Sequence, residues 1–172
     1  MKLVTIKKEF IDIFDFSMEI MYKDSNKHNR PFLMVLNLKY KSKKRTFALP
    51  FRSNIQVNKN TKGTYFPLPR RHSTKDKHTH GLHYIKILPI SKQYCNKFVV
   101  PDDSYNKMLM EYINKNTFKI VQGTQNYLID YENGIRHKFC TDIDRMIYAI
   151  EQYENTKKII EKTFEEVVAT KE

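Results

Sequence analysis

Residues 32–49 read FLMVLNLKYKSKKRTFAL, and this stretch decides the class of the fold. Every second side chain of its first half is apolar: Phe32, Met34, Leu36, Leu38 and Tyr40. This alternation predicts a half-buried antiparallel strand with these side chains on one face. The basic segment 41–44 can turn, so residues 45–49 are predicted to return as the partner strand. Pro50 has no N–H to donate and is predicted to end that strand.

The rest of the first half reads as short elements around a long basic segment. A strand is predicted over Leu3–Ile6 and an amphipathic helix over Glu9–Phe16. Ser53–His80 is polar and irregular apart from a short strand-like segment at residues 64–66. A structureless segment of this length is usually functional or disordered. A further strand is predicted over Leu82–Ile90.

The second half of the chain has the apolar spacing of helices. Residues 102–104 offer N-caps for a first helix, and a second helix is predicted over Phe118–Tyr131. Thr141 with Asp144 three residues later resembles a capping box that opens a third helix. Residues 157–172 either extend that third helix or form a frayed tail.

Strands followed by helices in one short chain predict an α+β fold, and the length predicts a single domain over residues 1–172. No N-terminal apolar run fits a signal peptide, and no stretch approaches the roughly 20 apolar residues of a membrane span. The two cysteines fit no metal-ligand spacing, which indicates free thiols in a reducing compartment. We therefore expect a cytoplasmic protein with no membrane partner.

Positive charge is concentrated in the middle of the chain. Residues 25–101 contain seventeen Lys and Arg but one acidic residue, Asp76, while the whole chain carries a net charge of +12. Clustered basic side chains without carboxylates are typical of a protein that binds a polyanion. The alternative is a solvated surface that merely reflects a Lys-rich composition.

The chain contains no recognised catalytic motif, neither a nucleophile elbow nor a phosphate-binding glycine loop. Two-metal nuclease sites gather several carboxylates, and the basic region has only Asp76. If the protein cleaves a nucleic acid, the sequence favours a route without metal or cofactor. RNA offers such a route, because its 2′-OH can attack the adjacent phosphorus and leave a 2′,3′-cyclic phosphate and a 5′-OH.

Three residues are candidates for this chemistry. Arg30 precedes the strand at residues 32–40, and Arg52 and Ser53 follow its predicted partner. The short hairpin is expected to bring these two points to the same end of the sheet, where two guanidiniums can hold one phosphate. The alternative for each arginine is a surface ion pair.

Four histidines, at positions 72, 78, 80 and 83, supply groups that titrate near neutrality. His83, on the predicted strand 82–90, is the best placed of the four for proton transfer. Solvated loop histidines are the alternative, and a zinc site at residues 78–83 is a distant one, since the spacing matches no known motif.

Several segments together resemble a known family. They are RPFLMVL at residues 30–36, FALPFRS at 47–53, GLHYIKILPI at 81–90 and YNKML at 105–109. In order and spacing they resemble the endoribonuclease toxins of type III toxin–antitoxin systems, the ToxN/AbiQ-like family with its Tenp and Cpt branches. The resemblance runs from about residue 2 to residue 154. It implies a compact, barrel-like twisted antiparallel sheet of the MazF/Kid kind with packed helices.

The resemblance also implies residue roles and partners. Ser53 falls on the family's active-site serine and Arg30 on a basic position before the Phe-containing strand. Arg52 replaces what is often Thr, and Ile55 stands where some members have a catalytic Lys, which leaves the second proton carrier open. The family implies metal-independent RNA cleavage, and a repeat-derived RNA pseudoknot that the toxin itself processes and that neutralises it in a closed protein–RNA complex.

The leading hypothesis is thus a toxin endoribonuclease acting on cellular or phage mRNA in phage defence or plasmid maintenance. Its expected catalytic residues are Ser53, Arg52, Arg30 and His83. A second group is expected to bind RNA: Lys59, Lys62, Arg70, Arg71, His72, Lys75, Lys77 and Lys86. The alternative is a non-catalytic RNA- or DNA-binding protein that uses the same basic surface.

Overall fold

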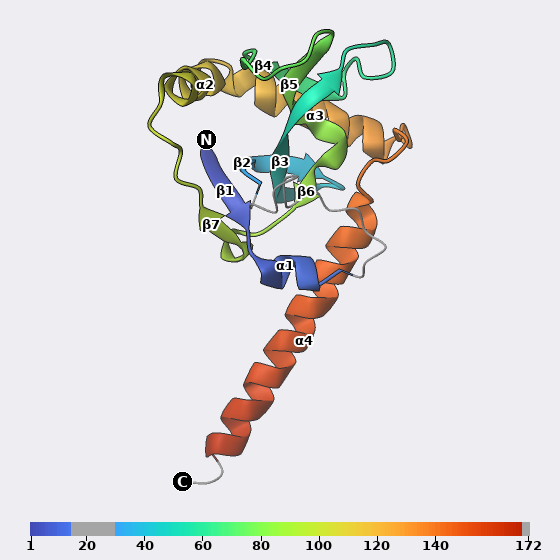
Figure 1. The fold of residues 1–172 in the computed structure, drawn as a ribbon. Coiled ribbons are helices and arrows are strands. Elements are labelled where there is room, and N and C mark those ends of the chain that lie inside the picture. The colour runs from blue at the N-terminus through green and yellow to red at the C-terminus, as the bar shows by residue number, and fades with distance from the viewer. Residues whose placement is uncertain (15–29, 170–172) are drawn as a thin grey trace.

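The structure is a computed structural model that describes residues 1–14 and 30–169 (Figure 1). A curved sheet forms the body, and a long C-terminal helix extends from it. The strands are β1 Lys2–Ile6, β2 Phe32–Tyr40, β3 Lys43–Gln56, β4 Tyr65–Leu68, β5 His78–His83, β6 Leu88–Pro89 and β7 Cys95–Lys97. The helices are α1 Lys8–Asp12, α2 Ser104–Lys115, α3 Thr117–Glu132 and α4 Ile143–Ala169, with 3-10 turns at Tyr84–Lys86 and Lys92–Tyr94.

All the strand pairings of this sheet are antiparallel, which confirms the predicted α+β class. The strand order is β4-β5-β3-β2-β1-β7, and β6 pairs with β3 beside this path. The two end strands, β4 and β7, do not pair with each other in the described residues. The described sheet is therefore not closed into a barrel, and the expected barrel-like form of the MazF/Kid kind is not confirmed.

The hairpin between β2 and β3 confirms the turn predicted from the basic segment. Lys41 and Ser42 both have positive φ, 46° and 64°. This combination is the left-handed pair of a two-residue type I′ turn, which matches the twist of the flanking strands. Tyr40 and Lys43 form the first pair next to the turn.

The predicted single apolar face of β2 is wrong. Its pairing with β3 shifts register between Val35 and Leu38, and Asn37 adopts a φ of 60°. Because a bulge adds one residue, the side chains beyond it change face. Phe32 and Met34 consequently pack in one core cluster, while Leu38 packs in the other, together with Leu33, Val35 and Tyr40.

Pro50 does not end β3, contrary to the prediction. The strand continues to Gln56 and changes partner at this point: Pro50 is opposite Phe32 of β2, and Phe51 is opposite Leu82 of β5. A proline is tolerated where the ladder passes from one neighbour to another, because its missing donor falls at the junction. β3 thereby links the part of the sheet that contains β2 to the part that contains β5.

The segment after β3 is more ordered than predicted. β4 covers Tyr65–Leu68, including Pro67, and β5 begins at His78 rather than at Leu82. Gly81 allows these two strands to lie close, since a Cβ there would meet the Tyr65 ring at 2.7 Å. The strand predicted over 82–90 is interrupted by the 3-10 turn at Tyr84–Lys86.

The helices cover both faces of the sheet. Leu109 of α2 and Leu128 of α3 are buried in the core cluster that contains Leu33, while Phe10 of α1 and Met146 of α4 belong to the cluster on the other side. The predicted cap of α2 is confirmed, because the Asp103 carboxylate accepts the N–H of Asn106 at 2.8 Å. At the start of α4 the capping side chain is Asp142, which accepts the N–H of Arg145 at 3.1 Å, rather than Thr141.

α4 includes residues 157–169 of the segment left open between a helix extension and a frayed tail, and residues 170–172 lie outside the described part of the chain. It continues as one helix to Ala169, and its second half projects away from the body (Figure 1). Ile143, Met146 and Ile147 in its first turns are buried, whereas all side chains at residues 155–166 are exposed. The helix predicted over Glu9–Phe16 is shorter, Lys8–Asp12, and its last two predicted residues lie outside the described part of the chain.

Candidate active site

A bulge in β3 forms the centre of the candidate site. The pairing of β3 with β5 shifts register between Arg52 and Ile55, and Asn54 in this bulge has a φ of 54°. Asparagine tolerates this left-handed conformation better than most residues. Its side-chain oxygen accepts the N–H of Lys75 at 3.0 Å, which ties the basic loop 69–77 to the bulge.

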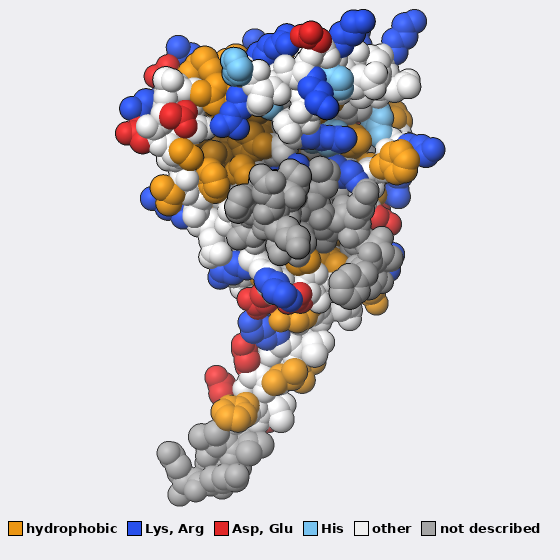
Figure 2. Space-filling model, viewed as in Figure 1, with side chains coloured by type: hydrophobic (Ala, Val, Ile, Leu, Met, Phe, Trp, Pro, Cys, Tyr) orange, Lys and Arg blue, Asp and Glu red, His pale blue; other side chains and the backbone are white. Residues whose placement is uncertain are grey.

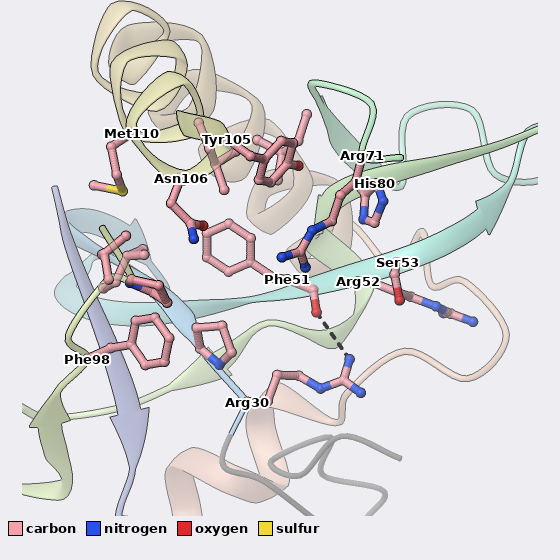
Figure 3. A pocket seen from close by; sticks show the side chains of 16 residues that line it. Arg30, Phe51, Arg52, Ser53, Arg71, His80, Phe98, Tyr105, Asn106 and Met110 are labelled. Atoms are coloured by element: carbon pink, nitrogen blue, oxygen red, sulfur yellow. Dashed lines mark hydrogen bonds between the residues drawn. The ribbon is translucent and has the colours of Figure 1, made fainter. Parts of the chain in front are cut away.

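A pocket of about 420 Å³ opens beside the bulge (Figure 3). Its lining includes Arg30, Arg52 and Ser53, so the structure brings together the three residues that the sequence placed at one end of the sheet. Arg71 reaches the pocket from above β3 in this view and Arg30 from below it. The Nη1 of Arg30 donates to the carbonyl of Phe51 at 3.1 Å, which fixes the guanidinium against β3.

The lining combines positive charge with an apolar wall. Three arginines and His80 face Phe51, Phe98 and Tyr105, and the lining contains no Asp or Glu. The Arg71 guanidinium lies 5.1 Å from the centroid of the Tyr105 ring, which orients it by a cation–π contact. Such a site suits a ligand that carries both a phosphate and a flat, weakly polar group.

His83 lies behind the bulge rather than in this pocket. It is 2% exposed, and its Nδ1 is 3.4 Å from the Nη1 of Arg52. Burial, together with the positive charges of Arg52, Lys86 and Arg30, lowers the pKa of His83 to about 3. In the free protein this imidazole is therefore neutral at pH 7, and its position is that of a support for Arg52.

His80 is one of the four histidines that the sequence offered, but it was not preferred for proton transfer there. It lines the pocket with Ser53, and its Nε2 atom is buried without a hydrogen-bond partner among the described residues. Burial and then the charge of Arg71 lower its pKa from 6.5. Recognising that β5 begins at His78 is the signal that would have found it, because a strand fixes the direction of His80 whereas a loop does not.

The residues predicted to bind RNA fall into four groups. Lys59 and Lys62 line a second cleft behind β3, and Arg71 lines the pocket described above. The exposed members on the loop before β5 are Arg70, His72, Lys75 and Lys77. Lys86 is only 7% exposed, so its burial does not favour the predicted contact with RNA.

The exposed Lys and Arg side chains around β4 and β5 give this face of the molecule a strong positive charge. Figure 2 shows Lys and Arg side chains gathered over the upper part of the molecule, where β4, β5 and their neighbouring turns lie. One of them is neutralised, because Arg70 pairs with Asp76 at 2.9 Å. Ile55, at the position where a catalytic Lys was considered, is 3% exposed and contributes no charge to this face.

Within residues 1–14 and 30–169, no three His, Cys, Asp or Glu side chains gather as a potential metal site. None of the described helices combines the length and apolarity needed to cross a membrane.

No protein-family model matches the chain, and no curated protein matches it in sequence. Solved structures do match its fold. One, from a bacterial antiviral system regulated by a processed non-coding RNA, has a TM-score of 0.64 and 16% identity, and the match covers 86% of this chain and 96% of that one. Another, from a bacterial type III toxin–antitoxin system whose toxin is selectively inhibited by a non-coding RNA pseudoknot, has a TM-score of 0.60 and 17% identity, covering 89% and 97%.

A third match is AbiQ, a lactococcal anti-phage endoribonuclease of a type III toxin–antitoxin system. Its TM-score is 0.67 at 14% identity, and the match covers 90% of this chain and 98% of that one. The chain therefore has the fold of the ToxN/AbiQ type III toxin–antitoxin proteins, which confirms the likeness noted in the sequence.

Proposed function

We propose that this protein is the toxin of a type III toxin–antitoxin system and cleaves RNA without a metal ion. The observation that carries the proposal is the pocket at the β3 bulge. It gathers Arg30, Arg52, Arg71, Ser53 and His80 without a carboxylate, within a fold shared with an anti-phage endoribonuclease. A pocket with this lining is suited to stabilising a negatively charged phosphorus centre.

The reaction uses the nucleophile that RNA itself carries. The 2′-oxygen forms a bond to the adjacent phosphorus as its proton leaves, and the bond from phosphorus to the 5′-oxygen breaks as that oxygen takes up a proton. The products are a 2′,3′-cyclic phosphate and a 5′-OH. The protein has to move two protons and stabilise the pentavalent phosphorane between them.

Each role has a candidate in this chain. Arg30 and Arg52 would hold the scissile phosphate, as the sequence predicted, and Ser53 would orient the 2′-OH. The buried position of His83 beside Arg52 supports a role in holding that arginine. The position of His80 in the pocket, with an unpartnered Nε2, favours it as the proton carrier.

The RNA partners that we propose would bind the basic surface around β4 and β5. One structural neighbour comes from an antiviral system that a processed non-coding RNA regulates, and another from a system whose toxin is inhibited by a non-coding RNA pseudoknot. We propose that the basic residues around β4 and β5 bind such an antitoxin RNA in a closed complex, and that the protein processes this RNA from its repeat precursor. Cellular or phage mRNA would be the target when the antitoxin is absent. This role belongs in the cytoplasm, in phage defence or plasmid maintenance.

Cleavage in the presence of excess EDTA tests the proposal. We expect RNA products that end in 2′,3′-cyclic phosphates, identified by mass spectrometry. Arg52→Ala and His80→Ala are expected to lower the cleavage rate by about 10²-fold or more, as is usual when a group that stabilises the transition state is lost. The control is Arg145→Ala, an exposed arginine on α4 that lines neither cleft.

Two outcomes would contradict the proposal. Loss of activity on chelation would require a metal-dependent mechanism. Salt-dependent RNA binding without cleavage would favour the non-catalytic nucleic-acid-binding protein instead.

A further inference from the structure

A second cleft lies on the other side of the β3 bulge. It has a volume of about 690 Å³ and is built from three segments: the end of β3 with the turn 58–62, the end of β5 with the following 3-10 turn, and the loop 137–139 between α3 and α4. Arg52 lines both this cleft and the pocket with Ser53. An RNA strand bound at the bulge would therefore reach both spaces.

An exposed aromatic ring stands at the edge of this cleft. Phe139 is 69% exposed although it is a large apolar side chain, and its φ is 64°. A bulky residue rarely adopts this left-handed conformation, and such conformations persist where the surrounding structure holds them. The N–H of Cys140 donates to the carbonyl of His137 at 3.1 Å, and the N–H of Thr141 donates to that of Ile85 at 2.8 Å. The loop that carries Phe139 is therefore fixed to the body.

The charges around the ring are positive. Lys59, Lys62 and Lys138 line the cleft with Arg52, and the lining contains no Asp or Glu. The Nζ of Lys138 lies 5.1 Å from the centroid of the Phe139 ring. Flat aromatic rings beside lysines are the combination with which proteins bind single-stranded nucleic acid, the ring stacking on a base and the lysines contacting phosphates.

We propose that this second cleft binds a nucleotide next to the scissile phosphate, with its base stacked on Phe139 and its phosphate held by Lys59 and Lys62. The assignment rests on the proposed function for its substrate, but it concerns a separate space with its own residues. Because stacking is tolerant of base identity, this cleft would position the strand rather than select its sequence.

The absence of tryptophan from the chain permits a direct test. Phe139→Trp introduces a unique tryptophan, whose fluorescence a stacked base quenches. The probe is a short fluorescein-labelled 2′-O-methyl oligoadenylate, which cannot be cleaved because it lacks the 2′-OH. The matched control is Phe118→Trp, since Phe118 on α3 is 75% exposed and lines neither cleft.

We expect the probe to quench the tryptophan of Phe139→Trp and to leave that of Phe118→Trp unchanged, over the concentration range in which fluorescence anisotropy reports binding. Phe139→Ala should weaken binding about tenfold or more, and Phe139→Tyr should retain it. Binding by anisotropy without quenching at position 139 would overturn the stacking site. Cleavage of a natural RNA by Phe139→Trp in the same preparation would then show that the proposed function stands without it.

Discussion

At the scale of single residues, His80 and His83 of β5 show how three positions along a strand change the chemistry of a side chain. His83 is enclosed and surrounded by cations, so its uncharged form is strongly favoured. His80 borders the pocket, and its pKa is lowered by partial burial and then by the charge of Arg71. Both belong to the residue type that sequence reasoning associates with acid–base catalysis, yet their environments separate a supporting role from a reactive one.

The low pKa of His83 predicts sensitivity to acid. The unfolded chain takes up a proton on this group near pH 6.5, whereas the folded protein does so only near pH 3. Between these values the unfolded state binds more protons, so the free energy of unfolding falls as the pH decreases, by at most about 1.4 kcal/mol per pH unit. In urea unfolding at pH 7 and pH 5, His83→Gln should therefore lose less stability between the two pH values than the unaltered protein.

An NMR titration of the His83 ring protons supplies the independent check. Its chemical shift should stay constant from pH 8 to about pH 4.5. A midpoint close to 6.5 would show that the site is hydrated in solution, and would contradict the neutral, buried state.

At the scale of elements, the sequence predicted what depends on local pattern. The turn at residues 41–44, the cap of α2 and the extent of α3 follow from side-chain types a few positions apart, and the structure confirms them. The bulge at Asn37 was not predictable in this way, because alternation continues through it in sequence while the pairing with β3 slips. The passage of β3 through Pro50 depends on which strands lie on either side, and periodicity carries no such information.

In the candidate site too, contacts within one hairpin were predictable from the sequence, whereas contacts between distant segments were not. Proximity of Arg30 to Arg52 and Ser53 follows from one hairpin, and the sequence sufficed to predict it. The second cleft is lined by segments about 80 residues apart in the sequence, one of which carries Phe139. Only the tertiary structure therefore reveals this cleft. The burial of Lys86 could likewise not be predicted from the sequence, since a lysine is expected at the surface.

The packing of α3 on the 3-10 turn predicts an unusual cost for adding a methyl group. Alanine ordinarily favours a helix over glycine by about 1 kcal/mol, but a Cβ at Gly123 would collide with the Tyr84 hydroxyl and lie 3.0 Å from its ring carbon Cζ. Overpacking of this kind costs about 1–3 kcal/mol. We therefore expect Gly123→Ala to lower the free energy of unfolding, measured by urea denaturation.

Removal of the colliding atom provides the control for this substitution. In a Tyr84→Phe background, Gly123→Ala should cost less, because the hydroxyl is gone. An increase in stability of the single variant would mean that the Tyr84 ring moves aside freely, and that the close packing does not restrict this position.

At the scale of the whole molecule, α4 has two parts with different roles. Met146 is fully buried in the core. Two ion pairs join the middle of the helix to the body: Arg45 with Glu151 at 2.8 Å, and Glu9 with Lys157 at 3.4 Å. From residue 158 to residue 166 all side chains are exposed. Helical propensity and salt bridges on its own surface, rather than tertiary packing, stabilise this outer part.

This division predicts that the outer part is dispensable for folding. A chain that ends at Lys158 should change the free energy of unfolding of the body by less than about 0.5 kcal/mol, while its far-UV circular dichroism loses helical signal. Met146→Ala is the contrasting variant, and should cost about 2–5 kcal/mol by leaving a cavity. If the truncated chain unfolds at clearly lower urea concentration, the outer part contacts the body in solution.

The projection of α4 also gives the molecule an electric polarity. The helix carries six acidic and four basic side chains, while the described residues 30–101 of the body carry sixteen Lys and Arg, so the centre of positive charge lies far from the helix tip. In the field of a nucleic acid this separation of charge acts as a dipole moment and exerts a torque. The protein would turn its two clefts toward the strand before contact, and the fraction of productive encounters would decline as added salt screens the field.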